Sequence, residues 1–152
     1  MASQTSNRQR GVAMVEFTIV LPVMLLMILG VSEIGTALVR YNTLTKALHE
    51  GVRHAAAYAV LGSTGIVNIN AQLINEVRNI VVYGNPLGNG SPILAGLTPA
   101  QIELTSVSSK EIRVSASYPY QPLIGPRLPS FGLGATDTFA FTMQAAITMR
   151  AL

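Results

Sequence analysis

The feature that most constrains this chain is an apolar run of 20 residues, from Val12 to Val31. A helix needs about 20 apolar residues to cross the ~30 Å hydrocarbon core of a bilayer. Pro22 and Gly30 fall inside the run, and both residue types are tolerated in membrane helices. One charged residue, Glu16, also falls inside it. The sequence therefore predicts a transmembrane helix over residues 12–31, in which Glu16 needs an explanation.

The charges that flank the run predict its orientation. Arg8 and Arg10 precede it with no acidic residue before them, whereas the first charge behind it is Glu33. Arginine and lysine near a span tend to remain in the cytoplasm. We therefore expect residues 1–11 to be a basic cytoplasmic leader and everything beyond the span to be exported.

A cleaved secretory signal peptide is the alternative interpretation of this segment. Its apolar region should be 7–15 residues long and should end at a small-x-small site. The run is longer than that, and the following sequence, GVSEIGTAL, offers no such site. We therefore expect the helix to be retained in the membrane.

Glu16 has two interpretations. It lies ~6 Å along a helix from Val12, which places it near the cytoplasmic interface. In the first interpretation its carboxylate reaches the interface, at a cost below the roughly 2.5–3.5 kcal/mol of a mid-membrane acid. In the second, the chain is cut between Gly11 and Val12, and Glu16 pairs with the new amine of Val12 on its own chain or on a neighbour.

These residues carry a family resemblance. A glycine, four residues, a glutamate, an aromatic residue and an apolar run resemble the processing site of type IV prepilins. More narrowly, the stretch from about residue 10 to 57 resembles the TadE-like family, which are minor pilins or pseudopilins of the tight-adherence (Flp) pilus machinery. The matching positions form three groups: Gly11, Val12, Glu16 and Phe17 at the processing site, Pro22, Glu33 and Gly35 in and after the span, and Glu50, Gly51 and Arg53 in a distal motif. His49 and His54 depart from the usual family pattern, with arginine and tyrosine expected respectively.

The resemblance implies a function and a location. The protein would be a structural minor pilin or pseudopilin, cut after Gly11 by a prepilin peptidase. It would sit in the bacterial inner membrane with a periplasmic C-terminal domain, and it could enter a surface pilus. Its partners would be the peptidase, other pilins or pseudopilins, the tight-adherence secretion machinery and membrane lipid. The alternative is an uncleaved, membrane-anchored periplasmic module for binding or sensing.

Beyond the span, the helical pattern continues to about Leu61. Apolar residues at alternating spacings of four and three form a stripe about 100° wide, the width of a packing face. We expect residues 32–61 to be an amphipathic continuation of the same helix that packs against a globular head; a coiled coil with a partner is the alternative. The stripe comprises Ile34, Leu38, Tyr41, Thr45, Leu48, Val52, Ala55 and Ala59, and the charged residues Glu33, Arg40, Lys46, Glu50 and Arg53 lie on the other side.

Residues 62–152 read as an α+β head. Helical periodicity from Ile69 to Val81 predicts a second helix, with Asn68 or Asn70 as its cap and Gly84 at its end. Residues 84–92 form a loop by composition. Alternating patterns at 101–107, 111–118 and 137–148 predict a three-stranded antiparallel sheet. The expected fold is pilin-like: a long N-terminal helix, a second helix and this sheet.

Several kinds of chemistry are not expected. The chain has no cysteine, which excludes disulfides and thiol nucleophiles, and its net charge of +3 is scattered, which argues against nucleic-acid binding. The stretch HEGVRH places His49 and His54 five residues apart, about 140° around a helix, whereas a zinc-binding H-E-x-x-H motif needs a spacing of four. We therefore expect no metal site, no cofactor and no enzymatic activity, and we expect both histidines and the Lys46–Glu50 and Glu50–His54 pairs to lie on a solvated face.

Overall fold

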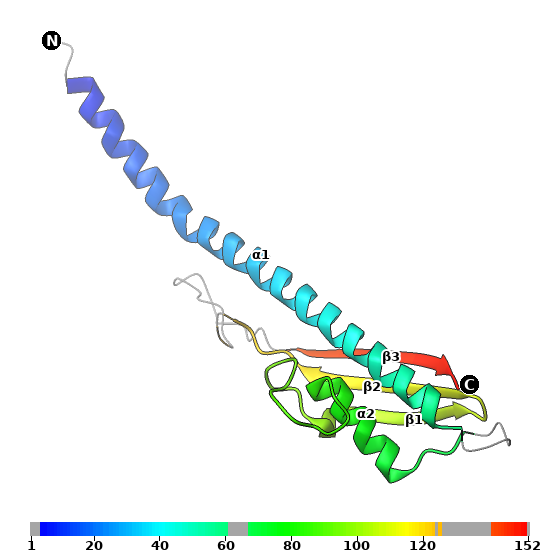
Figure 1. Ribbon diagram of the computed structural model, residues 1–152. Helices are drawn as coiled ribbons and strands as arrows, with labels where there is room; N and C mark the ends of the chain where they lie inside the picture. The colour runs from blue at the N-terminus through cyan, green and yellow to red at the C-terminus, as the bar shows by residue number, and fades with distance from the viewer. Residues whose placement is uncertain (1–3, 61–66, 124, 126–140, 152) are drawn as a thin grey trace. The chain divides into compact units, whose positions relative to one another are not determined.

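The computed structural model describes residues 4–60, 67–123, 125 and 141–151, and the side chains from residue 11 onward within those ranges. The elements, in chain order, are the helix α1 (Gln4–Tyr58), the helix α2 (Ala71–Tyr83), the short 3-10 helix η2 (Pro99–Gln101) and the strands β1 (Ile102–Ser108), β2 (Glu111–Pro119) and β3 (Thr142–Arg150) (Figure 1). The predicted α+β fold with a long N-terminal helix, a second helix and a three-stranded antiparallel sheet is confirmed.

The chain divides into two compact units. The first comprises Met1–Thr36 with Pro122–Phe139, and the second comprises Ala37–Gln121 with Ala140–Leu152. The helix α1 passes from the first unit into the second without a break in its backbone. It begins eight residues before the expected start at Val12 and ends three residues before the expected end at Leu61. Part of the predicted basic leader is therefore helical.

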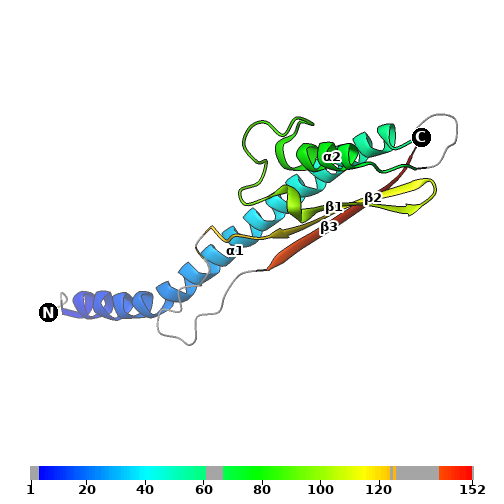
Figure 2. The same cartoon turned by 90° about the horizontal axis from the view of Figure 1, so that it is seen from below.

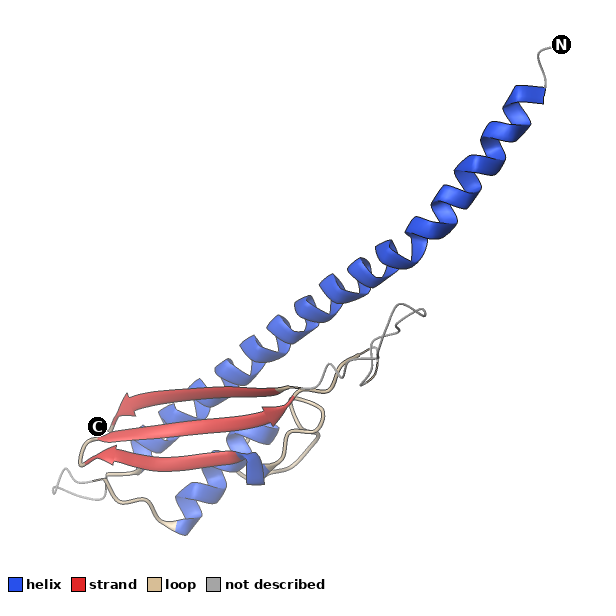
Figure 3. Ribbon diagram, turned by 180° about the vertical axis from the view of Figure 1, so that it is seen from behind, coloured by secondary structure: helices blue, strands red, loops and turns tan. Residues whose placement is uncertain are grey.

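The sheet has the simplest antiparallel order, β1-β2-β3. In its register Ile102 pairs with Ala116 and Glu111 pairs with Arg150, with an irregularity between Ser106 and Ser108 next to the β1–β2 turn. Burial alternates strictly along β2, as expected for a sheet with one face on a core. The buried members of β2 are Ile112, Val114, Ala116 and Tyr118. Figure 3 shows the other face of the sheet open, with the helices behind it.

The third strand differs from its prediction. It runs from Thr142 to Arg150, whereas the sequence predicted residues 137–148. Residues 137–140 lie outside the described residues. The predicted alternating set of this strand is Phe139, Phe141, Met143 and Ala145. Met143 and Ala145 are buried, but Phe141 precedes the strand, is 45% exposed and stacks on Tyr120 at 5.0 Å between ring centroids.

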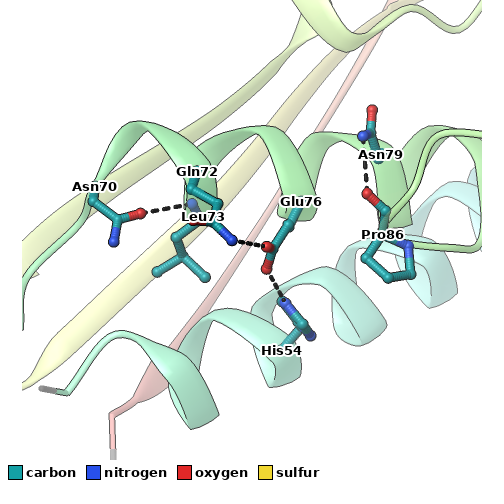
Figure 4. Close-up of polar contacts among 7 residues, drawn as sticks. All are labelled: His54, Asn70, Gln72, Leu73, Glu76, Asn79 and Pro86. Carbon is teal, nitrogen blue, oxygen red and sulfur yellow. Dashed lines mark hydrogen bonds and ion pairs between the residues drawn. The ribbon is translucent and has the colours of Figure 1, made fainter.

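The second helix follows its capping residues. The side chain of Asn70 accepts a hydrogen bond of 2.7 Å from the amide of Leu73, so Asn70 rather than Asn68 is the N-cap (Figure 4). Gly84 ends the helix with φ of +76°, a left-handed conformation that suits glycine. Ile69 precedes the cap and is not helical, so the helix begins two residues after the start of the predicted periodic stretch. Leu73, Val77, Val81 and Val82 are buried.

The predicted stripe of α1 is half confirmed. Its distal members Leu48, Val52, Ala55 and Ala59 are fully buried, which supports core packing. Its proximal members Ile34, Leu38 and Tyr41 are 56%, 59% and 42% exposed. The reason is length, because strands of at most nine residues extend only ~30 Å. A strand of this length can lie along only roughly 20 helical residues. The span and the stripe together are much longer than this, so the sheet cannot cover the proximal residues of the stripe.

The distal part of α1 and α2 lie close together, as Figure 2 shows. Gly51 is buried at this contact. A Cβ atom built on Gly51 would lie 2.5 Å from Cγ2 of Val81 and 3.5 Å from Cγ1 of Val77. Valine has little freedom to turn away, since a helix strongly prefers one of its rotamers. The absence of a side chain at position 51 therefore allows the two helices to approach.

A polar contact joins the same two helices. Nε2 of His54 lies 3.0 Å from Oε2 of Glu76, and the amide of Gln72 donates to the other carboxylate oxygen at 2.9 Å (Figure 4). The ring of His54 also packs on Tyr58, with 4.6 Å between centroids. The expectation that His54 pairs with Glu50 on a solvated face is therefore wrong. Glu50 instead lies 4.0 Å from Arg53, with both side chains largely exposed.

The hydrogen bond from His54 lowers the pKa of the Glu76 carboxyl below its ordinary value of 4.5, and the bond from Gln72 adds to this effect. A depressed carboxyl pKa means that the folded state favours the ionised form. The resulting stabilisation is fully present above pH 4.5 and is lost as the pH falls through the lowered pKa.

We predict that Gly51→Ala destabilises the fold. Overpacking costs about 1–3 kcal/mol, which exceeds the gain of up to ~1 kcal/mol from replacing glycine by alanine in a helix. The matched control is Gly35→Ala in the same helix, where an added Cβ meets nothing within 4 Å; this variant should be unchanged or more stable. The measurement is chemical denaturation of the full chain in detergent, followed by circular dichroism. Equal stability of the two variants would show that Val81 moves aside freely.

We predict that Glu76→Gln lowers stability at neutral pH and that its difference from the unaltered chain disappears as the pH falls well below 4.5. His54→Phe, which keeps a ring against Tyr58 but removes the donor, should show the same trend. The double variant should lose little more than either single variant, because both remove one interaction. Thermal unfolding at a series of pH values measures this. A difference that persists unchanged into acid would mean that the contact contributes nothing through the ionised carboxylate.

Candidate functional site

The predicted processing residues lie on the N-terminal part of α1. Gly11, Val12, Glu16 and Phe17 all belong to uninterrupted helix and all are exposed, with Val12 68% and Phe17 59% accessible. This part of α1 is the segment long and apolar enough to cross a membrane, with a mean hydropathy of 2.5 over its most apolar window, none of which is buried. Its apolar surface is therefore available to lipid or to other apolar helices.

The helix sets the geometry between Val12 and Glu16. Residues four apart lie one turn from each other on the same face, with ~5–6 Å between Cβ atoms. A glutamate side chain leans toward the N-terminus of its helix, which is the direction of Val12. Among the described side chains, none forms a hydrogen bond or ion pair with Glu16. Its carboxylate is thus within reach of an amine at position 12 and is not committed elsewhere among those residues.

Gly11 has two properties relevant to cleavage. An added Cβ would meet nothing within 4 Å, so packing does not require a glycine there. Glycine also weakens a helix interior by roughly 0.5–1 kcal/mol relative to alanine. A peptide bond in a helix must be locally opened before a protease can align it, and glycine at this position lowers the cost of that opening.

The three residues of the distal motif have different surroundings. Gly51 is buried against α2, as described above. Glu50 and Arg53 are on the exposed side, with side-chain exposures of 63% and 74%, and they form an i,i+3 ion pair at 4.0 Å. An ion pair so exposed contributes at most ~1 kcal/mol. Ile93 lies beside Glu50 in a shallow depression and is 42% exposed.

The helical projection places Glu33 on the side opposite the apolar stripe, and the structure buries this residue there. Glu33 is only 2% exposed. Its two carboxylate oxygens lie 3.1 and 3.3 Å from the backbone nitrogen of Leu123, which donates to them. Glu33 and Leu123 belong to the same compact unit although they are 90 residues apart. The spacing of residues along the helix cannot predict a contact between residues so far apart in the sequence.

Arg40 has a comparable role in the second unit. Its guanidinium donates a hydrogen bond to the carbonyl of Gln121 and lies over the ring of Tyr120, 5.1 Å from the centroid. Gln121 follows the end of β2 by two residues. Arg40, which the sequence placed on the side of the helix opposite the stripe, therefore binds the segment that leaves the sheet.

A metal centre does not emerge from the described residues. No group of three or more histidine, cysteine, aspartate or glutamate residues there could hold a metal ion. His49 is exposed, whereas His54 is half buried against Glu76 and Tyr58. The two histidines therefore face different surroundings.

Comparison with known proteins agrees with the resemblance of the sequence. Residues 11–53 match the model of a family described as TadE-like protein. No curated protein and no solved structure matches this chain. The matched segment begins at Gly11 and ends at Arg53, so it contains both the processing residues and the distal motif. On this match, residues 11–53 are similar to the TadE-like family.

Proposed function

We propose that this protein is a structural minor pilin or pseudopilin that helps to assemble a tight-adherence (Flp) type IV pilus. The observation that carries the proposal is the TadE-like match, which starts at the residue where processing is expected and continues through the apolar helix. The TadE-like family associates this segment with the tight-adherence pilus machinery. A role in assembly rather than catalysis follows from that association.

In this proposal, a prepilin peptidase cuts between Gly11 and Val12 and removes the basic leader. The mature chain keeps its span in the bacterial inner membrane and exposes its C-terminal head to the periplasm. Arg8 and Arg10 support that orientation, since positive residues favour the cytoplasmic side. Exposed apolar side chains along residues 12–31 support contact with lipid before assembly and with other pilin helices afterwards.

Glu16 has a specific part in this proposal. Processing gives Val12 a free amine one helical turn from the carboxylate. A carboxylate in an apolar setting is costly unless a partner of opposite charge satisfies it. The amine supplies that partner, on the same chain or on an adjacent subunit. Cleavage and assembly are then coupled through a single ion pair.

The first prediction of the proposal is the processing itself. The chain isolated from membranes should begin at Val12, and Gly11→Leu should leave it at full length because a large side chain obstructs the close approach of the protease backbone. Gly30→Leu is the control, since an added Cβ there also meets nothing within 4 Å; it should be cut normally. Mass spectrometry of the N-terminal peptide shows at which residue each variant begins. A chain that always begins at Met1 or Ala2 would favour an uncleaved, membrane-anchored binding or sensing module.

The second prediction concerns Glu16→Leu. This variant should insert and still be cut, yet fail to assemble, because loss of one member of a buried ion pair costs roughly 3–5 kcal/mol. That corresponds to at least about a hundredfold weaker association, at tenfold per ~1.4 kcal/mol. Co-purification with other pilus subunits and counts of surface pili measure the effect.

Thr18→Val is the matched control for Glu16→Leu. Among the described residues, the hydroxyl of Thr18 donates to the carbonyl of Met14 on its own helix, at 2.8 Å, and to no other group, so its removal should not affect assembly. Normal assembly by Glu16→Leu would mean that the carboxylate merely reaches the interface and forms no necessary pair.

A further inference from the structure

The contact between Glu33 and Leu123 lies at a specific depth relative to the bilayer. Glu33 follows the end of the predicted span by two residues, or ~3 Å along the helix. The polar layer on each side of the ~30 Å hydrocarbon core adds ~5–8 Å. Glu33 therefore lies within this layer, and its side chain leans back toward the N-terminus and thus toward the hydrocarbon.

Glu33 holds the backbone of Leu123 at that depth. The amide nitrogen of Leu123 is 3.1 Å from one carboxylate oxygen and 3.3 Å from the other, and Glu33 is almost completely covered. The side chain of Leu123 is nevertheless 69% exposed. An apolar side chain is thus presented outward immediately beside the end of the membrane span.

The backbone at this position suits a region poor in water. An amide donor without a partner is costly away from water, and irregular backbone is excluded from lipid chiefly for that reason. Pro122 has no amide hydrogen, and that of Leu123 is bonded to Glu33. Residues 122 and 123 therefore present no free amide donor to lipid.

We propose that Leu123 is a second membrane contact of this protein, inserted at the boundary between headgroups and acyl chains of the leaflet on the head side, with Glu33 as its positioning residue. The occupant is phospholipid, because the exposed apolar side chain belongs to a residue bound to Glu33, which follows the apolar span by two positions. Leu123 would then be held at the membrane surface by its own contact with lipid as well as by its hydrogen bond to Glu33 of α1. This inference depends on the membrane placement of α1 and not on pilus assembly or on cleavage.

The test uses the absence of tryptophan from the chain. The full-length variant Leu123→Trp, reconstituted in phosphatidylcholine vesicles, carries the only indole. Its emission should be shifted to shorter wavelength, quenched by phosphatidylcholine brominated high on the acyl chain, and protected from aqueous iodide. The matched control is Leu87→Trp, a loop position that is 79% exposed in the second unit; it should show the reverse pattern.

Glu33→Ala combined with Leu123→Trp tests the positioning role. Quenching by brominated lipid should fall and quenching by iodide should rise, while circular dichroism confirms that the helices and sheet remain. If this double variant does not fold, Leu123→Trp alone still decides whether lipid is the occupant. Emission from Leu123→Trp that matches that of Leu87→Trp would overturn the proposal. A wavelength shift without lipid quenching that grows with protein-to-lipid ratio would also overturn it, in favour of contact with a second copy.

Discussion

The helix α1 has an apolar face along its length, but the N-terminal part of this face is exposed and the distal part is buried in the protein core. The other features of the chain depend on this difference. Over residues 12–31 most side chains are exposed and suit hydrocarbon, whereas Leu48, Val52 and Ala55 are fully covered by protein. The helix is continuous between the exposed part and the buried part. A helix can do this because its backbone hydrogen bonds are internal in either solvent, so only the side chains decide what covers each face.

Two glutamates near the ends of the span are accommodated differently. Glu33 is buried and accepts a hydrogen bond from the backbone of a distant segment. Glu16 is exposed on the helix, one turn from the residue that processing would free. A carboxylate near hydrocarbon needs a donor or a cation, and the folded chain supplies one to Glu33. The proposed cleavage would supply one to Glu16, which ties the chemistry of the N-terminus to assembly.

The head is held to α1 through contacts of two kinds. Gly51 removes a side chain so that Val77 and Val81 can approach, and His54 and Glu76 then form a polar bond across the same contact. Gly51 and His54 lie three positions apart on α1, so the close approach of the two helices and the polar bond between them occur at the same contact. Gly51, in the predicted distal motif, therefore has a packing role, whereas Glu50 and Arg53 beside it remain largely exposed.

By itself, the sequence determined features that depend on local order: the length of the apolar run, the helical and alternating periodicities, and the glycine that ends α2. Each of these is a relation between residues a few positions apart, which backbone geometry converts directly into structure. Only the tertiary structure decided that Glu33 binds Leu123, that His54 binds Glu76 rather than Glu50, and that Ile34, Leu38 and Tyr41 stay exposed while the rest of their stripe is buried. These outcomes depend on which distant segment packs against a side chain and on the length of the sheet. Neither property produces a periodic pattern in the sequence.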